Sequence, residues 1–140
     1  MIAIDTNILL RYLLADDAMQ YKKASVVIKE QHPALITDVV LAETVWTLTG
    51  KRYSLDKTAV CAVVRGLISD AAFVFENAQV IWSSLCNYEE SIPIRGKELD
   101  FVDSLIANKS HCVVENKGTR LLAFYSFDKA VEQLKGAETP

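Results

Sequence analysis

Short apolar segments alternate with longer helix-like segments along the chain, and this alternation restricts the fold more than any other feature of the sequence. The segments predicted as strands are residues 2–5, 34–37, 73–75 and 121–125. Strands that alternate with helices usually form a parallel sheet with helices packed on its faces. The sequence therefore predicts an α/β fold of three layers, α/β/α, with a short, mostly parallel central sheet.

The predicted helices begin at residues that cap helices well. The expected capping residues, in chain order, are Asp16 or Asp17, Thr37 or Asp38, Ser54, Asn77, Asp100 and Asp128. Side-chain oxygens of these residue types accept hydrogen bonds from backbone N–H groups in the first turn. Gly50 and Gly118 are expected to end two of the helices, because glycine is common just past a helix C-terminus.

The length and composition predict one ordinary globular domain across residues 1–140. The N-terminus lacks the basic segment of a signal peptide, and no apolar stretch approaches the roughly 20 residues of a membrane span. The three cysteines have no metal-ligand spacing and are expected to be reduced, buried thiols. These features favour a cytoplasmic protein that does not cross a membrane.

Several acidic residues lie beside apolar segments, where a carboxylate is costly to place. They are Asp5, Glu43, Asp103 and Asp128, with Asp100 as a fifth candidate. Desolvation and mutual repulsion disfavour their charged forms, and a divalent metal ion among them would offset both effects. Mg²⁺ and Mn²⁺ prefer oxygen ligands, whereas the isolated His32 and His111 make a zinc site a poor alternative. Two such ions can activate a water and stabilise the leaving oxygen of a phosphodiester.

The positions of these acids also allow simpler interpretations. Asp5 follows the first expected strand and Asp128 the last, so both are expected at one edge of the sheet, where sites form in α/β proteins. Asp100 and Asp103 share a face in the first turn of an expected helix, where negative charge is favoured. Asp5, Asp100 and Asp128 could instead act only as helix caps, and Glu43 could be a solvated helix residue.

Four segments of the chain resemble the acidic motifs of PIN-domain ribonucleases. They are residues 2–10 (IAIDTNILL), 37–44 (TDVVLAET), 100–107 (DFVDSLIA) and 126–129 (SFDK), which occur in the same order as in that family. One such motif alone is weak evidence, but four in order over nearly the whole chain are specific. The small size is similar to that of the VapC-type toxin branch, whose members cleave RNA and are restrained by a VapB-type antitoxin.

The resemblance implies a role for each residue that matches a motif. Asp5, Glu43, Asp103 and Asp128 would be the catalytic acids and, together with Asp100, would bind Mg²⁺ or Mn²⁺. Thr6, Asn7 and Ser126 would orient these carboxylates or their waters, as metal sites generally require. The resemblance does not rank Asp100 against Asp103 as a ligand. It also implies a PIN-like fold, an RNA substrate, an antitoxin partner and a homodimer.

The net charge of −3 disfavours a general nucleic-acid binder, although the remainder of the chain is positive without the five acids. Basic residues near the acidic motifs could meet phosphates. They are Arg11, Arg95, Lys97, Lys109 and Lys129, of which Lys129 and Arg95 are favoured. Trp46 and Trp82 are expected to pack in a core or an interface rather than to stack on RNA, and Lys51 and Arg52 to be solvated.

Two functions of other classes remain open from the sequence. One is a PIN scaffold that binds a partner without catalysis. The other is a Mg²⁺-dependent phosphotransfer domain, in which one aspartate accepts a phosphoryl group. The second is less favoured, because Glu43 and Asp103 are expected inside helices rather than in loops.

Overall fold

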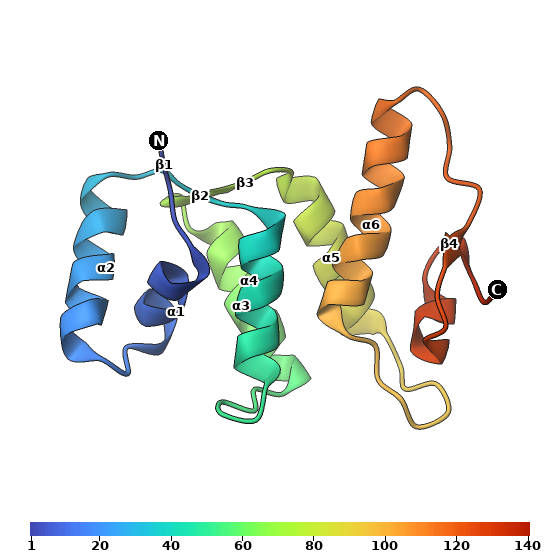
Figure 1. The fold of residues 1–140 in the computed structure, drawn as a ribbon, viewed down its shortest axis with the longest axis horizontal. Helices are drawn as coiled ribbons and strands as arrows, with labels where there is room; N and C mark the ends of the chain where they lie inside the picture. The colour runs from blue at the N-terminus through green and yellow to red at the C-terminus, as the bar shows by residue number, and fades with distance from the viewer. The chain divides into compact units, whose positions relative to one another are not determined.

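The chain consists of six α-helices, one 3₁₀-helix and five short strands, described for all residues 1–140 by a computed structural model (Figure 1). Every pairing between the named strands is parallel. This confirms the predicted α/β class, and the set of elements is compatible with a three-layer α/β/α fold. The chain divides into two compact units, Met1–Ala78 and Gln79–Pro140. The expectation of a single domain stays a prediction.

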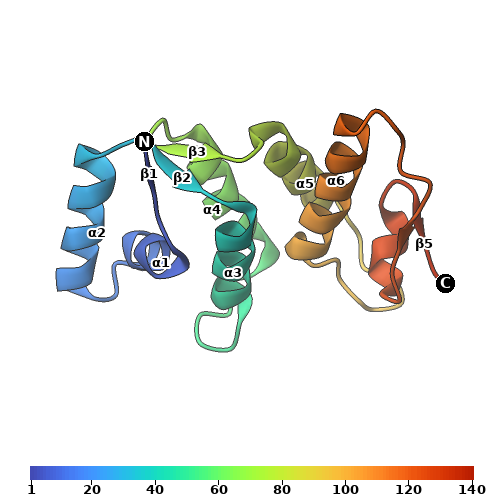
Figure 2. The same ribbon diagram turned by 45° about the horizontal axis from the view of Figure 1, so that its top comes forward.

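The first unit consists of a three-stranded sheet and four helices. Its elements are β1 (Ile2–Ala3), α1 (Thr6–Leu14), α2 (Ala18–Glu30), β2 (Ala34–Ile36), α3 (Asp38–Thr49), α4 (Lys57–Ser69) and β3 (Phe73–Phe75). The strands lie in the order β1-β2-β3, so each strand neighbours the next one along the chain. Helices α1 and α2 connect β1 to β2, and α3 and α4 connect β2 to β3, as the ribbon shows in Figures 1 and 2.

The core of the first unit forms where the sheet meets the inner faces of the helices. Its largest fully buried side chains are Leu9, Ile28, Ile36, Leu41, Val45, Leu48, Val60 and Val64. Burial of one such aliphatic side chain contributes about 1.5–3 kcal/mol. Leu9 lies in α1 and Leu41 in α3, so the same burial that stabilises the unit fixes the two helices that carry Asp5, Thr6 and Glu43.

The second unit contains two long helices and a small C-terminal sheet. Its elements are α5 (Ala78–Glu90), α6 (Phe101–Asn116), β4 (Phe124–Tyr125), the 3₁₀-helix η1 (Lys129–Gln133) and β5 (Ala137–Glu138). The rings of Tyr88 and Phe101 meet edge to face at 5.7 Å, and the Ser104 hydroxyl donates to the Ser84 carbonyl at 2.9 Å. These contacts join α5 to the N-terminal half of α6.

A hydrophobic cluster in the second unit fixes η1. It consists of Leu99, Ala107, Ala130, Val131 and Leu134, with Phe124 and Ala137 packed against it. Members of this cluster come from α6, from η1 and from the segment just before α6. The cluster therefore holds the start of α6 and the start of η1 within one packed unit, and these two starts carry Asp100 and Asp128.

Most helix starts agree with the sequence predictions, and one does not. Asp17, Thr37, Asp100 and Asp128 each accept a hydrogen bond from a backbone N–H of the first turn. The prediction for Ser54 is wrong, because α4 is capped by Asp56, whose Oδ1 accepts from the Ala59 N–H at 2.9 Å. Ser54 has φ of 50° and donates its hydroxyl to the Lys51 carbonyl at 3.1 Å. Ser54 therefore belongs to the turn before the helix.

The C-terminal segment differs most from the predictions. The expected strand 121–125 is limited to Phe124–Tyr125, and the expected last helix is the 3₁₀-helix η1. Strand β5 was not predicted, because residues such as Ala137 and Glu138 have little preference for strands. Since β4 pairs with β5 in a sheet of its own, Asp5 and Asp128 follow strands of different sheets rather than strands at one edge of a single sheet.

Two expectations from composition can be compared with the structure. The three cysteines are free, as predicted, but only Cys61 is buried, while Cys86 and Cys112 are half-buried. Among the helices, none has both the length and the apolar character that a membrane crossing requires.

Candidate functional site

The first unit carries two of the candidate acids, Asp5 and Glu43. Asp5 directly precedes α1 and caps it, because its Oδ1 accepts from the Ile8 N–H at 2.9 Å. Glu43 lies in the middle of α3, and its Oε2 accepts a hydrogen bond from the Thr6 hydroxyl at 2.5 Å. The Thr6 side chain therefore links the first turn of α1 to the carboxylate on α3.

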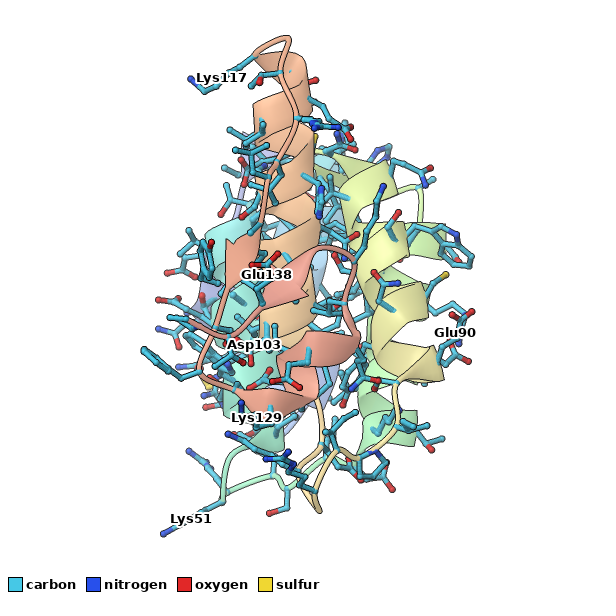
Figure 3. All side chains as sticks on the ribbon, turned by 90° about the vertical axis from the view of Figure 1, so that its right-hand side faces the viewer. Lys51, Glu90, Asp103, Lys117, Lys129 and Glu138 are labelled. Carbon is cyan, nitrogen blue, oxygen red and sulfur yellow. The ribbon has the colours of Figure 1, made fainter.

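In the second unit, Asp100 and Asp128 lie near enough to Asp103 to act on it electrostatically. Asp100 caps α6, Asp103 lies in the first turn of the same helix (Figure 3), and Asp128 caps η1. Burial raises the pKa of Asp103, the negative charges of Asp100 and Asp128 raise it further, and the positive charge of Lys97 acts in the opposite direction. The three carboxylates thus share one negative electrostatic environment, which disfavours ionisation of Asp103.

A lysine already lies against this group of acids. The Lys97 Nζ is 3.0 Å from Asp128 Oδ2, and 62% of the lysine side chain is exposed. This charge lowers the pKa of Asp103 only in part, because the net shift remains upward. A group of oxygen donors with uncompensated negative charge suits a hard divalent cation such as Mg²⁺ or Mn²⁺. These residues are of the chemical type that such a cation binds, and the metal itself stays a prediction.

Three of the candidate acids also cap helices, as the simpler interpretation predicted. Asp5, Asp100 and Asp128 each use Oδ1 to accept a first-turn N–H, at 2.8–2.9 Å. An ionised carboxylate offers about four acceptor positions over its two oxygens. A cap on one oxygen consequently leaves capacity for a cation, so capping and metal binding are compatible at these positions.

The burial expected for the acids is only partly observed. Asp103 and Asp128 are half-buried, whereas Asp5, Glu43 and Asp100 are exposed. Apolar neighbours in the sequence do not bury Glu43, because consecutive helix residues point in directions about 100° apart. The strong desolvation predicted from sequence neighbours therefore does not apply to these three exposed acids.

The predicted supporting residues make different contacts. Thr6 donates to the carboxylate of Glu43, as described above. The Ser126 hydroxyl accepts from the Asp128 N–H at 3.0 Å, so Ser126 fixes the backbone of that acid rather than its carboxylate. Asn7 lies in the lining of a pocket beside Glu43.

This pocket of the first unit has a volume of about 560 Å³, and several of its residues were not predicted as part of a site. The lining consists of Thr6, Asn7, Leu10, Arg11, Glu43, Trp46, Thr47, Arg52 and Tyr53. Trp46 is 53% exposed and is not a core residue, in contrast to one of the predicted alternatives. The sequence could have identified Trp46 as part of the site, because it follows Glu43 by three residues and this spacing places both residues on one helix face. No comparable signal marked Tyr53.

The favoured phosphate contact Lys129 is engaged elsewhere. Its Nζ is 3.1 Å from Glu132 Oε1 and 3.3 Å from the Thr139 hydroxyl. Lys97, which was the less favoured prediction, is the lysine that pairs with a candidate acid.

The structure thus groups the predicted acids by unit: Asp5 and Glu43 lie in the first, and Asp100, Asp103 and Asp128 in the second. It contains no group of three or more His, Cys, Asp or Glu side chains arranged to hold a metal ion. The ligand roles of the five acids stay predictions. Comparisons of the chain with protein-family models, with curated proteins and with solved structures find no match.

Proposed function

We propose that the protein is a Mg²⁺- or Mn²⁺-dependent endoribonuclease, as its resemblance to PIN-domain ribonucleases implies. The observation that carries this proposal is the group formed by Asp100, Asp103 and Asp128, in which burial and mutual repulsion raise the pKa of Asp103. Clustered carboxylates of this kind are unfavourable alone and favourable around a hard cation. They are typical of sites that act on phosphate esters through metal ions.

The residues of the proposed site have two roles: some would bind the ions, and others orient those ligands. Asp5, Glu43, Asp100, Asp103 and Asp128 would be the ligands. A bound ion would lower the pKa of a water and offset the negative charge that develops on the phosphate. The Thr6 hydroxyl keeps the Glu43 carboxylate in one orientation. Capping bonds on Oδ1 restrict the rotation of Asp5, Asp100 and Asp128, so these carboxylates are pre-oriented.

Cleavage of an end-labelled, single-stranded RNA of mixed sequence tests this function. We expect wild-type protein to cut it with Mg²⁺ or Mn²⁺ and not in excess chelator, and Asp5→Asn and Asp103→Asn to leave only background cleavage. Asp56→Asn is the matched control, because Asp56 caps α4 through the same kind of bond and lies outside the acid groups. Full cleavage in chelator, or by Asp5→Asn, would contradict the proposal.

The same resemblance places this activity in a biological setting, which we propose with it. The nuclease would be a cytoplasmic toxin that forms a homodimer and is restrained by a VapB-type antitoxin. Induction in a bacterial host should then stop growth, and Asp103→Asn should not. Sedimentation of the purified protein measures the oligomeric state. A scaffold without catalysis would give no metal-dependent cleavage, and a phosphotransfer domain would be labelled on aspartate by a small phosphodonor.

A further inference from the structure

The pocket beside Glu43, named here the α1–α3 pocket, has this proposed metal ligand in its lining. Glu43, Trp46 and Thr47 are spaced i, i+3 and i+4 on α3, so their side chains lie along one face. Trp46 is displaced from Glu43 by about 4.5 Å along the helix axis, at 1.5 Å per residue. A chain bound at Glu43 would therefore reach the indole of Trp46 within about one turn of α3.

The lining of the α1–α3 pocket also carries positive charge and aromatic surface. The turn after α3 supplies Arg52, whose side chain is 74% exposed, and Tyr53. The guanidinium of Arg52 lies over the Tyr53 ring, 5.2 Å from its centroid. An arginine held in this way can still direct its N–H groups to a phosphate, because the ring contacts only one face of the guanidinium.

The Asp16 carboxylate contacts Arg11, Tyr53 and Arg52 and so helps to fix their positions. This carboxylate is 2.7 Å from Arg11 Nη1, accepts the Tyr53 hydroxyl at 3.2 Å, and is 3.9 Å from Arg52 Nη2. The close contact with Arg11 is a direct charged hydrogen bond, whereas the contact with Arg52 is at the limit of an ion pair. Arg52 is thus positioned by Asp16 and Tyr53 while its charge stays available to an anion.

We propose that the α1–α3 pocket binds a nucleotide of single-stranded RNA next to the phosphodiester that is cleaved. Trp46 stacks on the base, and Arg52 contacts the phosphate on the side away from Glu43. This inference rests on the proposed ribonuclease function and assigns part of its substrate. An exposed indole and an exposed arginine along one groove are the features by which proteins bind single strands without reading their sequence.

RNA fits these features better than an acidic peptide does. A peptide carboxylate would satisfy Arg52 but offers no flat ring to stack on the exposed face of the Trp46 indole. A nucleotide supplies both an anion and a flat base, joined at short range. The pocket volume of about 560 Å³ also lies within the range of roughly 300–1,000 Å³ usual for ligand sites.

Tryptophan fluorescence can test the pocket directly, because the chain has only two tryptophans. In a Trp82→Phe background, Trp46 is the single emitter. We expect a short single-stranded RNA of mixed sequence, titrated in chelator so that cleavage does not interfere, to quench its emission. Polyglutamate of similar length supplies the anionic control and should not quench.

Two substitutions then assign the contacts, each with a matched control. Trp46→Leu should weaken RNA binding about tenfold by anisotropy of labelled RNA, as expected for one stacked base, and Trp82→Leu should not. Arg52→Gln should reduce the slope of log affinity against log salt by about one. Lys51→Gln removes the same charge at the next position, from a side chain that points away from the ribbon in Figure 3, and should change this slope less.

The outcomes separate this inference from the proposed function. Wild-type cleavage with unchanged RNA binding by both pocket variants would overturn the pocket assignment and leave the nuclease intact. Equal quenching by polyglutamate would identify a general anion or peptide site and would also overturn it. Absence of both RNA binding and cleavage in the wild-type protein would remove the two proposals together.

Discussion

Asp103 is a site acid whose ionisation the folded protein disfavours. Because its pKa is raised in the fold, its contribution to stability is complete below the pKa of the unfolded chain and is lost as pH rises through the folded pKa. In metal-free protein at neutral pH, we expect Asp103→Asn to raise the midpoint of thermal unfolding. The difference should disappear below the ordinary aspartate pKa of about 3.9, where both side chains are neutral. Circular dichroism in chelator over a pH series measures it.

Asp56→Asn provides the reference for this measurement, since it makes the same chemical change at an exposed cap outside the acid group. Its effect should not follow the pH dependence of Asp103→Asn. Equal unfolding midpoints of Asp103→Asn and wild type at neutral pH would contradict the electrostatic account of the second unit.

The fold lowers the pKa of Asp16, whereas it raises that of Asp103. Partial burial acts to raise the pKa of Asp16, but the hydrogen bond and charge of Arg11, together with the Tyr53 hydroxyl, outweigh it and lower the pKa. Its stabilising effect is present above the unfolded pKa and is lost as pH falls through the folded pKa. We therefore expect Asp16→Asn to be less stable than wild type at neutral pH, with the gap closing in acid. Urea unfolding at several pH values measures this gap.

The neighbouring Asp17→Asn is a suitable comparison for Asp16→Asn, because asparagine can replace aspartate as the cap of α2. A gap for Asp16→Asn that stays constant from neutral to acid pH would show that the carboxylate charge is not what stabilises this corner. In that case the positioning of Arg52 through Asp16 would lose its support.

At the scale of elements, the start of α4 distinguishes the structure from the sequence prediction. Asp56→Ala should lower the free energy of unfolding by about 1 kcal/mol, because it removes the side chain that accepts the Ala59 N–H. Ser54→Ala should have a smaller effect, since the Ser54 hydroxyl bonds only to carbonyls of the preceding turn. Chemical denaturation of the two variants compares these values. A larger loss of unfolding free energy for Ser54→Ala than for Asp56→Ala would indicate that Ser54, not Asp56, caps α4.

Helix starts could be predicted where the deciding interaction is local. Asp17, Thr37 and Asp100 each bond to an N–H two or three residues ahead, so neighbouring residues contain the information. Ser54 misled the prediction because its positive φ cannot be read from its residue type. Strands β4 and β5 pair although η1 separates them in the sequence, so their pairing depends on the folded chain. The residue type of Ala137 does not favour a strand and did not indicate this pairing.

At the scale of the whole molecule, metal binding should appear as stability. A ligand that binds only the folded protein stabilises it by about 2.7 kcal/mol at a hundred times its Kd. We expect added Mg²⁺ or Mn²⁺ to raise the unfolding midpoint of wild type and of Asp56→Asn, and to leave that of Asp103→Asn nearly unchanged. Differential scanning calorimetry measures these shifts. The same shift in Asp103→Asn and wild type would exclude Asp103 as a ligand.

Sequence motifs select the candidate acids, whose roles stay predictions, but the surroundings of these acids could not be predicted. Ordered motifs in the sequence identified Asp5, Glu43 and Asp128 individually. The salt bridge of Lys97 to Asp128 joins segments more than a helix apart in the sequence, and no local rule selects Lys97 over Lys129. The α1–α3 pocket likewise depends on how the turn after Gly50 directs Arg52, which only the folded chain determines.

The caps at Asp5, Asp100 and Asp128 have a genetic consequence. Asparagine serves as well as aspartate at a helix N-terminus, but it lacks the negative charge by which a carboxylate attracts a divalent cation. The codons of the two residues differ by a single base. If the proposed nuclease is a burden to the cell that makes it, one point mutation at any of these positions would silence it and leave a chain that still folds, is still produced, and can still occupy its partners.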